Sequence, residues 1–263
     1  MINSVLKAIR ILNLFHASQT RLSLAEISRC SNIPKSTAHH LLTTLLSQGF
    51  IEKVEGDLYA LGTAPLALTQ KIRVNVEIRD PAAPLLRELA DNTRESVYLT
   101  IKDGDYALYI YAVESPQRLL ARTAVGDRVP LHCTSVGKAM LAFLTEEELE
   151  EIVGRVGLST FTENTLDTID MLIQDLARTR QRGYSLDKEE HELKTYCIGA
   201  PIFDRTGRVT AACSISGSSP TIVSDRLDDL STHVVHTAQE ISRRMGYVPT
   251  RVWSLRSSMI EPR

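Results

Sequence analysis

Apolar residues near the start of the chain recur every three or four positions, which is the spacing of one side of an α-helix. Over residues 4–15 they are Val5, Ile9, Leu12 and Phe15. This pattern predicts a first helix whose apolar side packs on the segments that follow. A second helix is expected from Ser23, because a serine there can cap the helix while Glu26 reaches back to the Ser23 amide.

Residues 35–48 predict a third helix with two different sides. Its apolar side is formed by four leucines, Leu41, Leu42, Leu45 and Leu46. The opposite side carries polar residues at helical spacing, namely Ser36, His39 or His40, Thr43 and Ser47. The polar turn Ser31-Asn32 separates this helix from the second one, Pro34 suits its first turn, and Gly49 ends it.

A β-hairpin is predicted directly after the third helix. Residues 50–54 and 58–61 form its strands, and Glu55-Gly56-Asp57 forms its turn. A capped short helix, a short turn, another helix and a hairpin follow one another in this order in winged helix-turn-helix proteins. The series therefore predicts a DNA-binding domain over residues 1–62, whereas any one of these helices alone would be read as an ordinary solvated helix.

The polar side of the third helix supplies side chains that suit the major groove of double-stranded DNA. Hydroxyl and imidazole groups can contact base edges, and lysines can contact phosphates. The predicted DNA-binding residues are Lys35, Ser36, Thr37, His39, His40, Thr43 and, on the hairpin, Lys53.

After the hairpin, the pattern predicts a linker helix over residues 63–79, with Leu68, Ile72 and Val76 along one side. Asp80-Pro81 is expected to end that helix and to start another, which Asp80 caps. The following segments predict an α+β domain over residues 80–249 and an unpacked tail over 250–263. Its strands are expected at 96–104, 105–114, 119–124, 184–187, 195–203 and 208–216, and its later helices at 134–144, 145–153, 167–181 and 224–246.

The composition is that of a globular protein, with 43% apolar and 24% charged residues. No run approaches the roughly 20 apolar residues that span a bilayer, and the N-terminus has no apolar signal region. We therefore expect a cytoplasmic protein without membrane contact. Its four cysteines lack the spacing of a metal or disulfide motif, so free thiols and no metal site are expected at Cys30, Cys133, Cys197 and Cys213.

The formal net charge of −2 is unevenly distributed along the chain. Residues 1–80 carry nine Lys and Arg against six Asp and Glu, a net charge of +3, and the remainder carries −5. The positive part coincides with the predicted DNA-binding domain. Because this charge is small, we expect dimerisation to be needed to gather enough phosphate contacts.

Polar residues from separate segments of the second domain suggest a ligand pocket. Thr134 and Ser135 stand at a predicted helix start, where unpaired amides favour an anion such as a carboxylate. Ser214 and Ser216 point to the same face of a strand, because side chains alternate along it. The neighbouring strands are expected to add Cys197 and Asp187. These groups would suit a small polar ligand, and the alternative is that they are ordinary core residues.

An enzyme is the main alternative to a regulator, with Cys197 as nucleophile and His191 or His132 as its base. The sequence has no nucleophile elbow, phosphate-binding loop or metal-ligand spacing, so no catalytic residue and no cofactor are predicted. A third reading is a DNA-binding protein without an effector, which would leave the second domain without a role.

Four sequence blocks, residues 23–45, 129–144, 182–190 and 196–217, together resemble the isocitrate-lyase-regulator (IclR-type) family of bacterial transcription factors. The resemblance runs from about Ser4 to Gly246. It implies a winged helix-turn-helix, a linker helix that dimerises and a GAF-like α+β effector-binding domain, assembled as a homodimer or homotetramer on a palindromic operator. It also implies a regulator, usually a repressor, of a catabolic operon that senses a small organic acid such as a keto, sugar or aromatic acid.

The resemblance also implies which residues contact the effector. By motif they are Ser135, Val136, Asp187, Thr195, Cys197, Ser214 and Ser216. Val136 and Thr195 depart from common family residues, and the extra bulk and the extra hydroxyl favour a compact hydroxy or keto acid. His39-His40 stands where Arg or a His-Arg pair is common, so the resemblance leaves the preferred operator sequence open.

Overall fold

The chain divides into two compact units, Met1–Asn75 and Val76–Arg263, in a computed structural model. The structure describes residues 1–16, 19–69, 71–73, 75–115 and 125–248. The predicted strand at 119–124 and the predicted tail at 250–263 lie outside these residues. Within the described ranges, every helix is too short or too polar to span a lipid bilayer.

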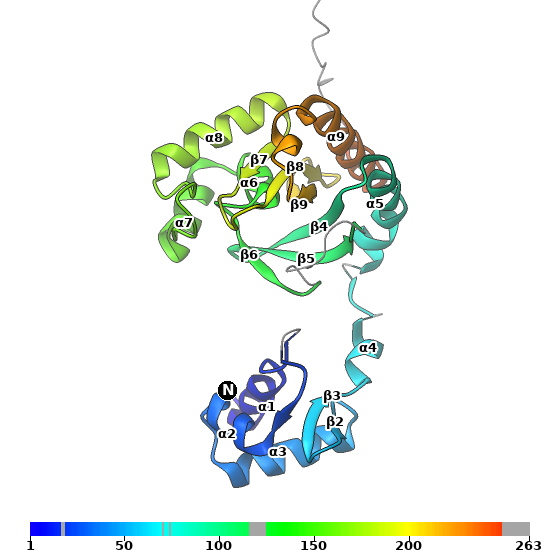
Figure 1. Ribbon diagram of the computed structural model, residues 1–263, viewed down its shortest axis with the longest axis vertical. Coiled ribbons are helices and arrows are strands. Elements are labelled where there is room, and N and C mark those ends of the chain that lie inside the picture. The colour runs from blue at the N-terminus through cyan, green and yellow to red at the C-terminus, as the bar shows by residue number, and fades with distance from the viewer. Residues whose placement is uncertain (17–18, 70, 74, 116–124, 249–263) are drawn as a thin grey trace, which may run out of the picture. The chain divides into compact units, whose positions relative to one another are not determined.

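The N-terminal unit is a winged helix-turn-helix, as predicted (Figure 1). Its helices are α1 (Asn3–Leu12), α2 (Leu24–Ser31), α3 (Lys35–Ser47) and α4 (Ala64–Thr69), and its strands are β1 (Leu22–Ser23), β2 (Ile51–Val54) and β3 (Leu58–Leu61). The strands form an antiparallel sheet in the order β1-β3-β2. Helices and sheet share one apolar core, whose fully buried members include Ile11, Ile27 and Leu42.

Local sequence signals explain why α2 and α3 start and end where they do. Ser23 and Glu26 form the predicted capping box, in which the Ser23 amide donates to Glu26 Oε2 at 2.8 Å. Asn32 ends α2 in the left-handed conformation, with a φ of 53°. Pro34 stands immediately before α3, where its missing N–H costs nothing.

The predicted apolar side of α1 is correct at Leu12 and Phe15, which pack in the core of this unit, and wrong at Val5 and Ile9. Val5 and Ile9 are half exposed, whereas Ile11 is fully buried. Helix α1 ends at Leu12, and the chain turns so that Phe15 enters the core from outside the helix. The buried side of α1 is therefore rotated from the predicted one, and an apolar side remains uncovered in the single chain.

The predicted continuous linker helix is also wrong. Helix α4 ends at Thr69, where the amides of Lys71 and Ile72 bond to carbonyls only three residues back. Leu68 and Ile72 stay half exposed, so these two described apolar residues add little burial that would stabilise a longer helix. The side chain of Val76, the third predicted member of that apolar side, is outside the described part.

The predicted break at Asp80-Pro81 does not occur. A π-helical turn, η1 (Asn75–Arg79), runs directly into α5 (Asp80–Thr93), and no side chain caps the junction. Pro81 has no N–H with which to bond the carbonyl four residues earlier. The wider π turn that precedes it accommodates this missing donor.

The C-terminal unit is an α+β domain built on one antiparallel sheet, in the order β6-β5-β4-β9-β8-β7. Its strands are β4 (Ser96–Asp103), β5 (Tyr106–Val113), β6 (Arg128–Pro130), β7 (Ser185–Lys188), β8 (Tyr196–Phe203) and β9 (Val209–Gly217). After α5 its helices are α6 (Ser135–Leu141), α7 (Glu146–Val156), α8 (Ile169–Arg182), the 3-10 turn η2 (Pro220–Val223) and α9 (Leu227–Arg244). The sequence did not predict β6 or η2.

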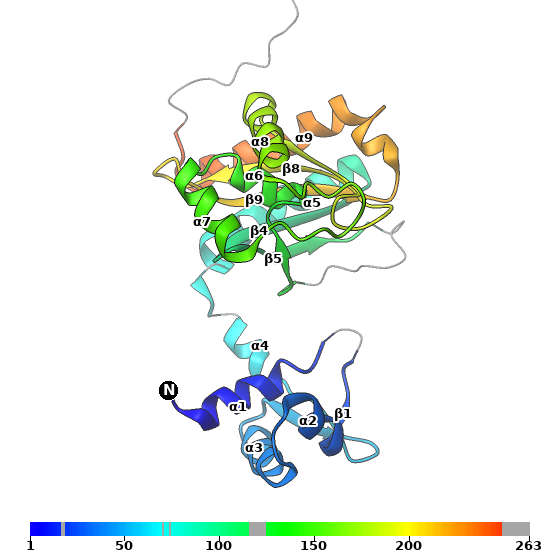
Figure 2. The same ribbon diagram turned by 90° about the vertical axis from the view of Figure 1, so that its left-hand side faces the viewer.

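The two faces of this sheet are covered by different helices, as the views of Figures 1 and 2 show. Helices α5 and α9 pack on one face, and α6 packs on the other with α8 behind it. Cys213 of β9 points towards α9, where its Sγ lies 4.0 Å from the carbonyl oxygen of Val234. Because side chains alternate, the neighbouring residues Ser214 and Ala212 face α6.

Two glycines let α6 lie close to its surroundings. A Cβ on Gly199 of β8 would lie 2.6 Å from the carbonyl oxygen of Ser135, and a Cβ on Gly137 would lie 2.2 Å from that of Leu131. Side chains at either position would push the start of α6 away. These glycines therefore fix Ser135 directly above the middle of the sheet.

Candidate effector pocket and DNA-binding surface

Three predicted effector residues form one row across adjacent strands. Asp187 of β7 pairs with Cys197 of β8, and Cys197 pairs with Ser216 of β9. Directly paired residues of an antiparallel sheet point to the same face. The Cys197 thiol accordingly lies 3.1 Å from the Ser216 hydroxyl. The register of three strands therefore brings together residues that are distant in the sequence.

A second row runs beside the first. Ser214 of β9 pairs with Gly199 on one side and with Tyr98 of β4 on the other. The glycine leaves room above β8 for the start of α6, and the tyrosine closes the row with an aromatic ring. The two rows form the floor of a small polar cavity of about 30 Å³.

Six of the seven predicted effector residues line this cavity. They are Ser135, Asp187, Thr195, Cys197, Ser214 and Ser216. The other lining residues are Tyr98, Tyr109, Val129, Thr134, His191 and Glu192. Val136 is the exception, because its side chain is buried in the apolar core with Met140 and Leu172. Val136 faces away from the cavity, so it cannot narrow the site directly.

The start of α6 forms the roof of the cavity. The Thr134 hydroxyl accepts a hydrogen bond from the Gly137 amide at 3.2 Å and donates to the Pro130 carbonyl at 2.7 Å. The Ser185 hydroxyl donates to the Ser135 carbonyl and ties this turn to β7. The amides of Ser135 and Val136 have no acceptor within α6, as for any first helical turn. They add positive potential beside the hydroxyls.

Asp187 is the carboxyl group of the cavity. It is 3% exposed, and its Oδ1 accepts a hydrogen bond of 2.9 Å from the Glu190 amide. Burial, reinforced by the neighbouring Glu190 charge, raises the pKa of Asp187 to about 8. The carboxyl group is therefore protonated at neutral pH and can donate a hydrogen bond to a ligand.

A buried ion pair lies behind Asp187. Lys138 of α6 is 1% exposed, and its Nζ lies 2.6 Å from Glu190 Oε1 and 3.0 Å from Asp175 Oδ2 of α8. Burial raises the pKa of Glu190, and the nearby Lys138 charge opposes that rise. This pair links α6 to the loop after β7, in which the Glu190 amide donates a hydrogen bond to Asp187. The ion pair was not predicted from the sequence, because Lys138 resembles a surface lysine within its helix.

Tyr98 and Tyr109 are lining residues that the sequence analysis missed. Their rings meet edge to face with centroids 5.4 Å apart, and the Tyr98 hydroxyl donates to the Glu114 carboxylate at 3.0 Å. They stand on β4 and β5, where tyrosines are common strand residues. Only the strand register, which the sequence does not reveal, would have marked them as neighbours of Ser214.

The structure separates the two histidines of the enzyme alternative. His191 lines the cavity with Cys197, whereas His132 lines a different cavity. Burial lowers the pKa of both imidazoles. Two other thiols are unreactive in this setting, because burial raises the pKa of Cys213 to about 12 and that of Cys133 well above its usual range. Across the described residues, no group of three or more His, Cys, Asp or Glu side chains could hold a metal ion.

The predicted DNA-binding residues of α3 form an exposed polar side. Lys35, Ser36, His39, His40 and Thr43 are exposed, and Thr37 is partly buried. The Thr43 hydroxyl donates to the His39 carbonyl at 2.9 Å, which leaves its oxygen as an acceptor towards the outside. The opposite side holds Ala38 and Leu42, both fully buried. The predicted two-sided helix is thus present, with Ala38 as an additional core residue.

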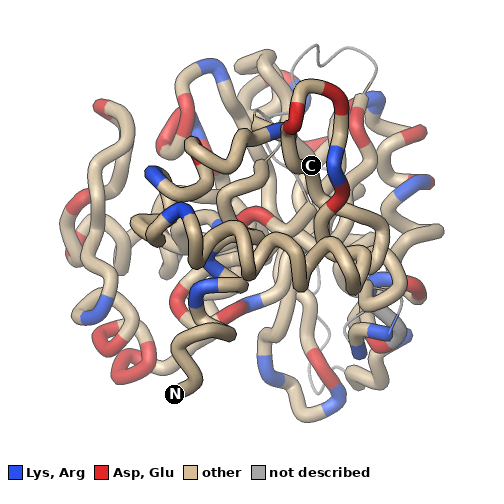
Figure 3. The backbone as a smooth tube through the Cα atoms, turned by 90° about the horizontal axis from the view of Figure 1, so that it is seen from below, with Lys and Arg blue, Asp and Glu red and all other residues tan. Residues whose placement is uncertain are grey.

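Lys53 lies on β2 of the wing and is half exposed. Its Nζ lies 2.8 Å from Asp57 Oδ1 in the hairpin turn, which raises the pKa of Lys53. The charge of this lysine is thus paired with a carboxylate of the hairpin turn. Figure 3 shows Lys and Arg mixed with Asp and Glu along the described part of the backbone.

Comparison with known proteins assigns both parts of the chain. Residues 4–55 match the IclR helix-turn-helix domain, and residues 70–243 match the C-terminal domain of the bacterial transcriptional regulator IclR. The chain is 34% identical over 248 residues to the HTH-type transcriptional regulator XynR of Escherichia coli, covering 94% of this chain and 98% of XynR. It is 33% identical over 249 residues to the transcriptional repressor IclR of the same organism, covering 93% of this chain and 90% of the repressor.

A solved structure shares the fold of the whole chain. An IclR homolog from Microbacterium hydrocarbonoxydans, crystallised with 4-hydroxybenzoate, aligns with a TM-score of 0.83 at 21% identity and covers 92% of this chain and 98% of that one. The two family matches and the identity along nearly the whole chain agree with the winged helix-turn-helix and the α+β domain seen here. The chain belongs to the IclR family of bacterial transcriptional regulators.

Proposed function

We propose that this protein is a repressor of a catabolic operon and that its affinity for DNA falls or otherwise changes when it binds a small organic acid. The observation that carries the proposal is the row formed by Asp187, Cys197 and Ser216 under the start of α6, in a chain that also carries a DNA-reading helix. The repressor named in the comparison supports the sign of regulation.

In this proposal the exposed side of α3 reads the operator. Ser36, His39 and His40 contact base edges, and Thr37 and Thr43 line the same groove. Lys35 and Lys53 contact phosphates on either side of it. Two chains bind the two half-sites of a palindromic operator, because the small positive charge of one N-terminal unit gives weak binding by itself. A homodimer or a homotetramer satisfies this requirement, and we place its action in the bacterial cytoplasm.

The chemistry of the cavity favours a compact hydroxy or keto acid. The protonated Asp187 and the hydroxyls of Ser214 and Ser216 can donate hydrogen bonds to a carboxylate. Thr195 and the amides at the start of α6 add further donors. The 4-hydroxybenzoate held by the structural relative is also an organic acid, which supports this ligand class.

The volume of the cavity explains how such an acid can act as a switch. A cavity of about 30 Å³ is far smaller than the roughly 150 Å³ that holds benzene, so we expect an organic acid to need a wider arrangement of α6 and the strands. The acid therefore binds one conformational state more tightly than the other. A tenfold change in DNA affinity needs about 1.4 kcal/mol of such a difference, which a few hydrogen bonds supply.

A thermal-shift screen against small keto, hydroxy, sugar and aromatic acids tests this proposal. We expect one class of acid to raise the unfolding midpoint of the native chain, because ligand binding stabilises the folded state. The double variant Ser214→Ala, Ser216→Ala should lose this shift while keeping its unliganded midpoint within a few degrees.

Ser218→Ala is the matched control, because Ser218 is exposed just beyond the same strand. It should keep the full shift. An acid that stabilises the double variant as strongly as the native chain would place its binding site elsewhere and refute the assignment.

A further inference from the structure

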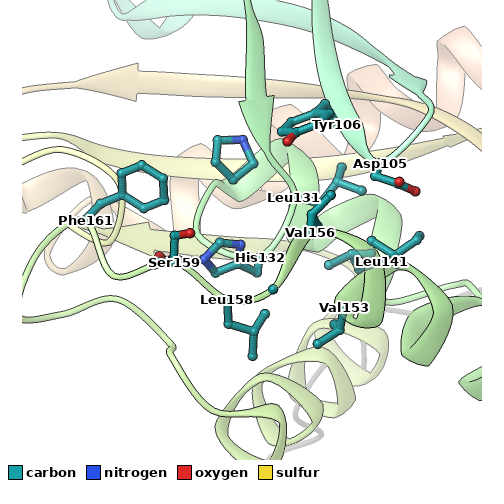
Figure 4. A pocket seen from close by; sticks show the side chains of 13 residues that line it. Asp105, Tyr106, Leu131, His132, Leu141, Val153, Val156, Leu158, Ser159 and Phe161 are labelled. Carbon is teal, nitrogen blue, oxygen red and sulfur yellow. Dashed lines mark hydrogen bonds between the residues drawn. The ribbon is translucent and has the colours of Figure 1, made fainter.

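The C-terminal unit contains a second cavity that has no lining residue in common with the effector pocket. Its volume is about 120 Å³, and it lies between the segment before α6, the end of α7 and the loop that follows α7 (Figure 4). Most of its wall is apolar. The main apolar side chains are Leu131, Leu141, Ile152, Val156, Leu158 and Phe161.

One buried polar side chain interrupts this apolar wall. His132 is 5% exposed, and its Nε2 lies 3.0 Å from the Ser159 carbonyl oxygen. That carbonyl can only accept, so Nε2 carries the proton and Nδ1 of the neutral ring is an acceptor. In Figure 4 the ring lies between Ser159 on one side and Leu131 and Val156 on the other. Among hydrogen bonds between described residues, the His132 ring makes the one to Ser159.

The volume of the cavity and its one buried polar side chain together define the ligand that it can bind. Aliphatic cavities of about 150 Å³ hold benzene and remain free of water, so 120 Å³ suits a single small ring. The acceptor at His132 requires one hydrogen-bond donor on that ring. We propose that this cavity is a second ligand site, which binds a monocyclic phenol with its ring among the aliphatic side chains and its hydroxyl donating to His132 Nδ1.

The second site is connected to the effector pocket by a shared segment. Val129, Thr134 and Ser135 line the effector pocket, whereas Pro130, Leu131 and His132 between them line the second cavity. Phe161 also bridges the two, because its ring centroid lies 6.2 Å from that of His132 and 4.9 Å from that of His191.

Hydrogen bonds strengthen this connection. Next to Phe161, the Thr165 hydroxyl donates to the Glu190 carbonyl at 2.6 Å, and the Glu190 amide donates to Asp187. We expect a ligand that contacts Phe161 to affect the residues on both sides of it. Occupancy of the second site changes the affinity of the effector pocket, and the effect is reciprocal.

A calorimetric titration of the full chain with phenol tests the site. We expect saturable binding of one phenol per chain and at least tenfold weaker binding of toluene, which fits the cavity but has no donor. Val156→Phe should weaken phenol binding at least tenfold, because the larger ring fills the cavity. Glu150→Ala, on the exposed side of the same helix, should bind phenol as the native chain does.

Two further variants separate this site from the effector pocket and from simple misfolding. His132→Phe keeps an aromatic ring but removes the acceptor, so phenol and toluene should bind it with similar affinity. The double variant Ser214→Ala, Ser216→Ala should bind phenol normally whatever its response to acids. Absence of saturable phenol binding, full binding by Val156→Phe, or loss of binding in the serine double variant would each overturn the proposal.

The connection is tested in the same titration by nuclear magnetic resonance. The Cε1–H signal of His191, identified by its absence in His191→Gln, should shift together with that of His132 as phenol saturates the site. A His191 signal that stays fixed while His132 shifts would overturn the coupling between the two cavities.

Discussion

Asp187 is the residue whose ionisation should control the effector pocket. Its pKa of about 8 means that the folded chain keeps this proton at neutral pH, whereas an unfolded chain releases it near pH 4. Between these two values the unfolded state binds fewer protons, so this group makes the fold less stable as pH rises from about 4 to 8. The proposed function accounts for this loss of stability, because a neutral carboxyl group can donate a hydrogen bond to an acid that an ionised one would repel.

The affinity of the pocket for an organic acid should therefore fall as pH rises through about 8. Below that pH Asp187 donates a hydrogen bond, and above it the ionised group repels the carboxylate. Asp187→Asn, which is always neutral and can donate, should bind with an affinity that changes much less between pH 7 and pH 9. Calorimetric titrations at pH 6, 7, 8 and 9 measure this. A native affinity that rises above pH 8 would contradict a protonated Asp187.

At the scale of elements, the Lys138 and Glu190 pair holds α6 to the loop before β8. Lys138→Met removes the cation and leaves Glu190 buried and Asp175 partly buried without it, which should cost about 3–5 kcal/mol of unfolding free energy. The double variant Lys138→Met, Glu190→Leu removes the buried pair and should recover a large part of that loss.

Unfolding of the full chain in urea, monitored by circular dichroism, measures the unfolding free energy of both variants. Lys188→Met is a control, because Lys188 is an exposed lysine of β7 in the same region. A Lys138→Met variant as stable as this control would show that the pair contributes little to the fold.

The sequence predicted elements better than it predicted which of their sides are buried. The capping box at Ser23 occurs as expected because it depends on residues three positions apart. The buried side of α1 and the path from α4 to α5 depend on the surrounding structure and were predicted wrongly. A spacing pattern cannot distinguish an apolar side covered by the same chain from one that stays exposed.

The candidate site also shows that local patterns do not predict which residues become neighbours in the fold. Alternation along one strand was enough to place Ser214 and Ser216 on one face. The rows that join them to Cys197, Asp187 and Tyr98 depend on the register of four strands, which the sequence does not encode locally. The residue pattern proposed Ser135, Asp187, Cys197, Ser214 and Ser216. The family resemblance added Thr195 and Val136, and the side chain of Val136 enters the apolar core.

At the scale of the whole molecule, an uncovered apolar surface accompanies the DNA-reading helix. Ile2, Val5, Leu6 and Ile9 of the α1 region, together with Leu66 and Leu68 of α4, are all at least 42% exposed. Apolar surface of this kind is typical of a protein–protein contact. In the proposed function a second copy of the chain is the partner that a palindromic operator requires, so we expect the N-terminal units to associate through these side chains.

The central claim is that an acid bound in one unit controls DNA binding by the other. The most direct test is the affinity of the full chain for a duplex that it selects from a random library, measured by fluorescence anisotropy with and without the acid found in the thermal screen. We predict an inverted repeat, and an affinity that changes at least tenfold with the acid in the native chain but not in the Ser214→Ala, Ser216→Ala variant. Selection of no sequence above the random library, or an affinity that the acid leaves unchanged, would contradict the account.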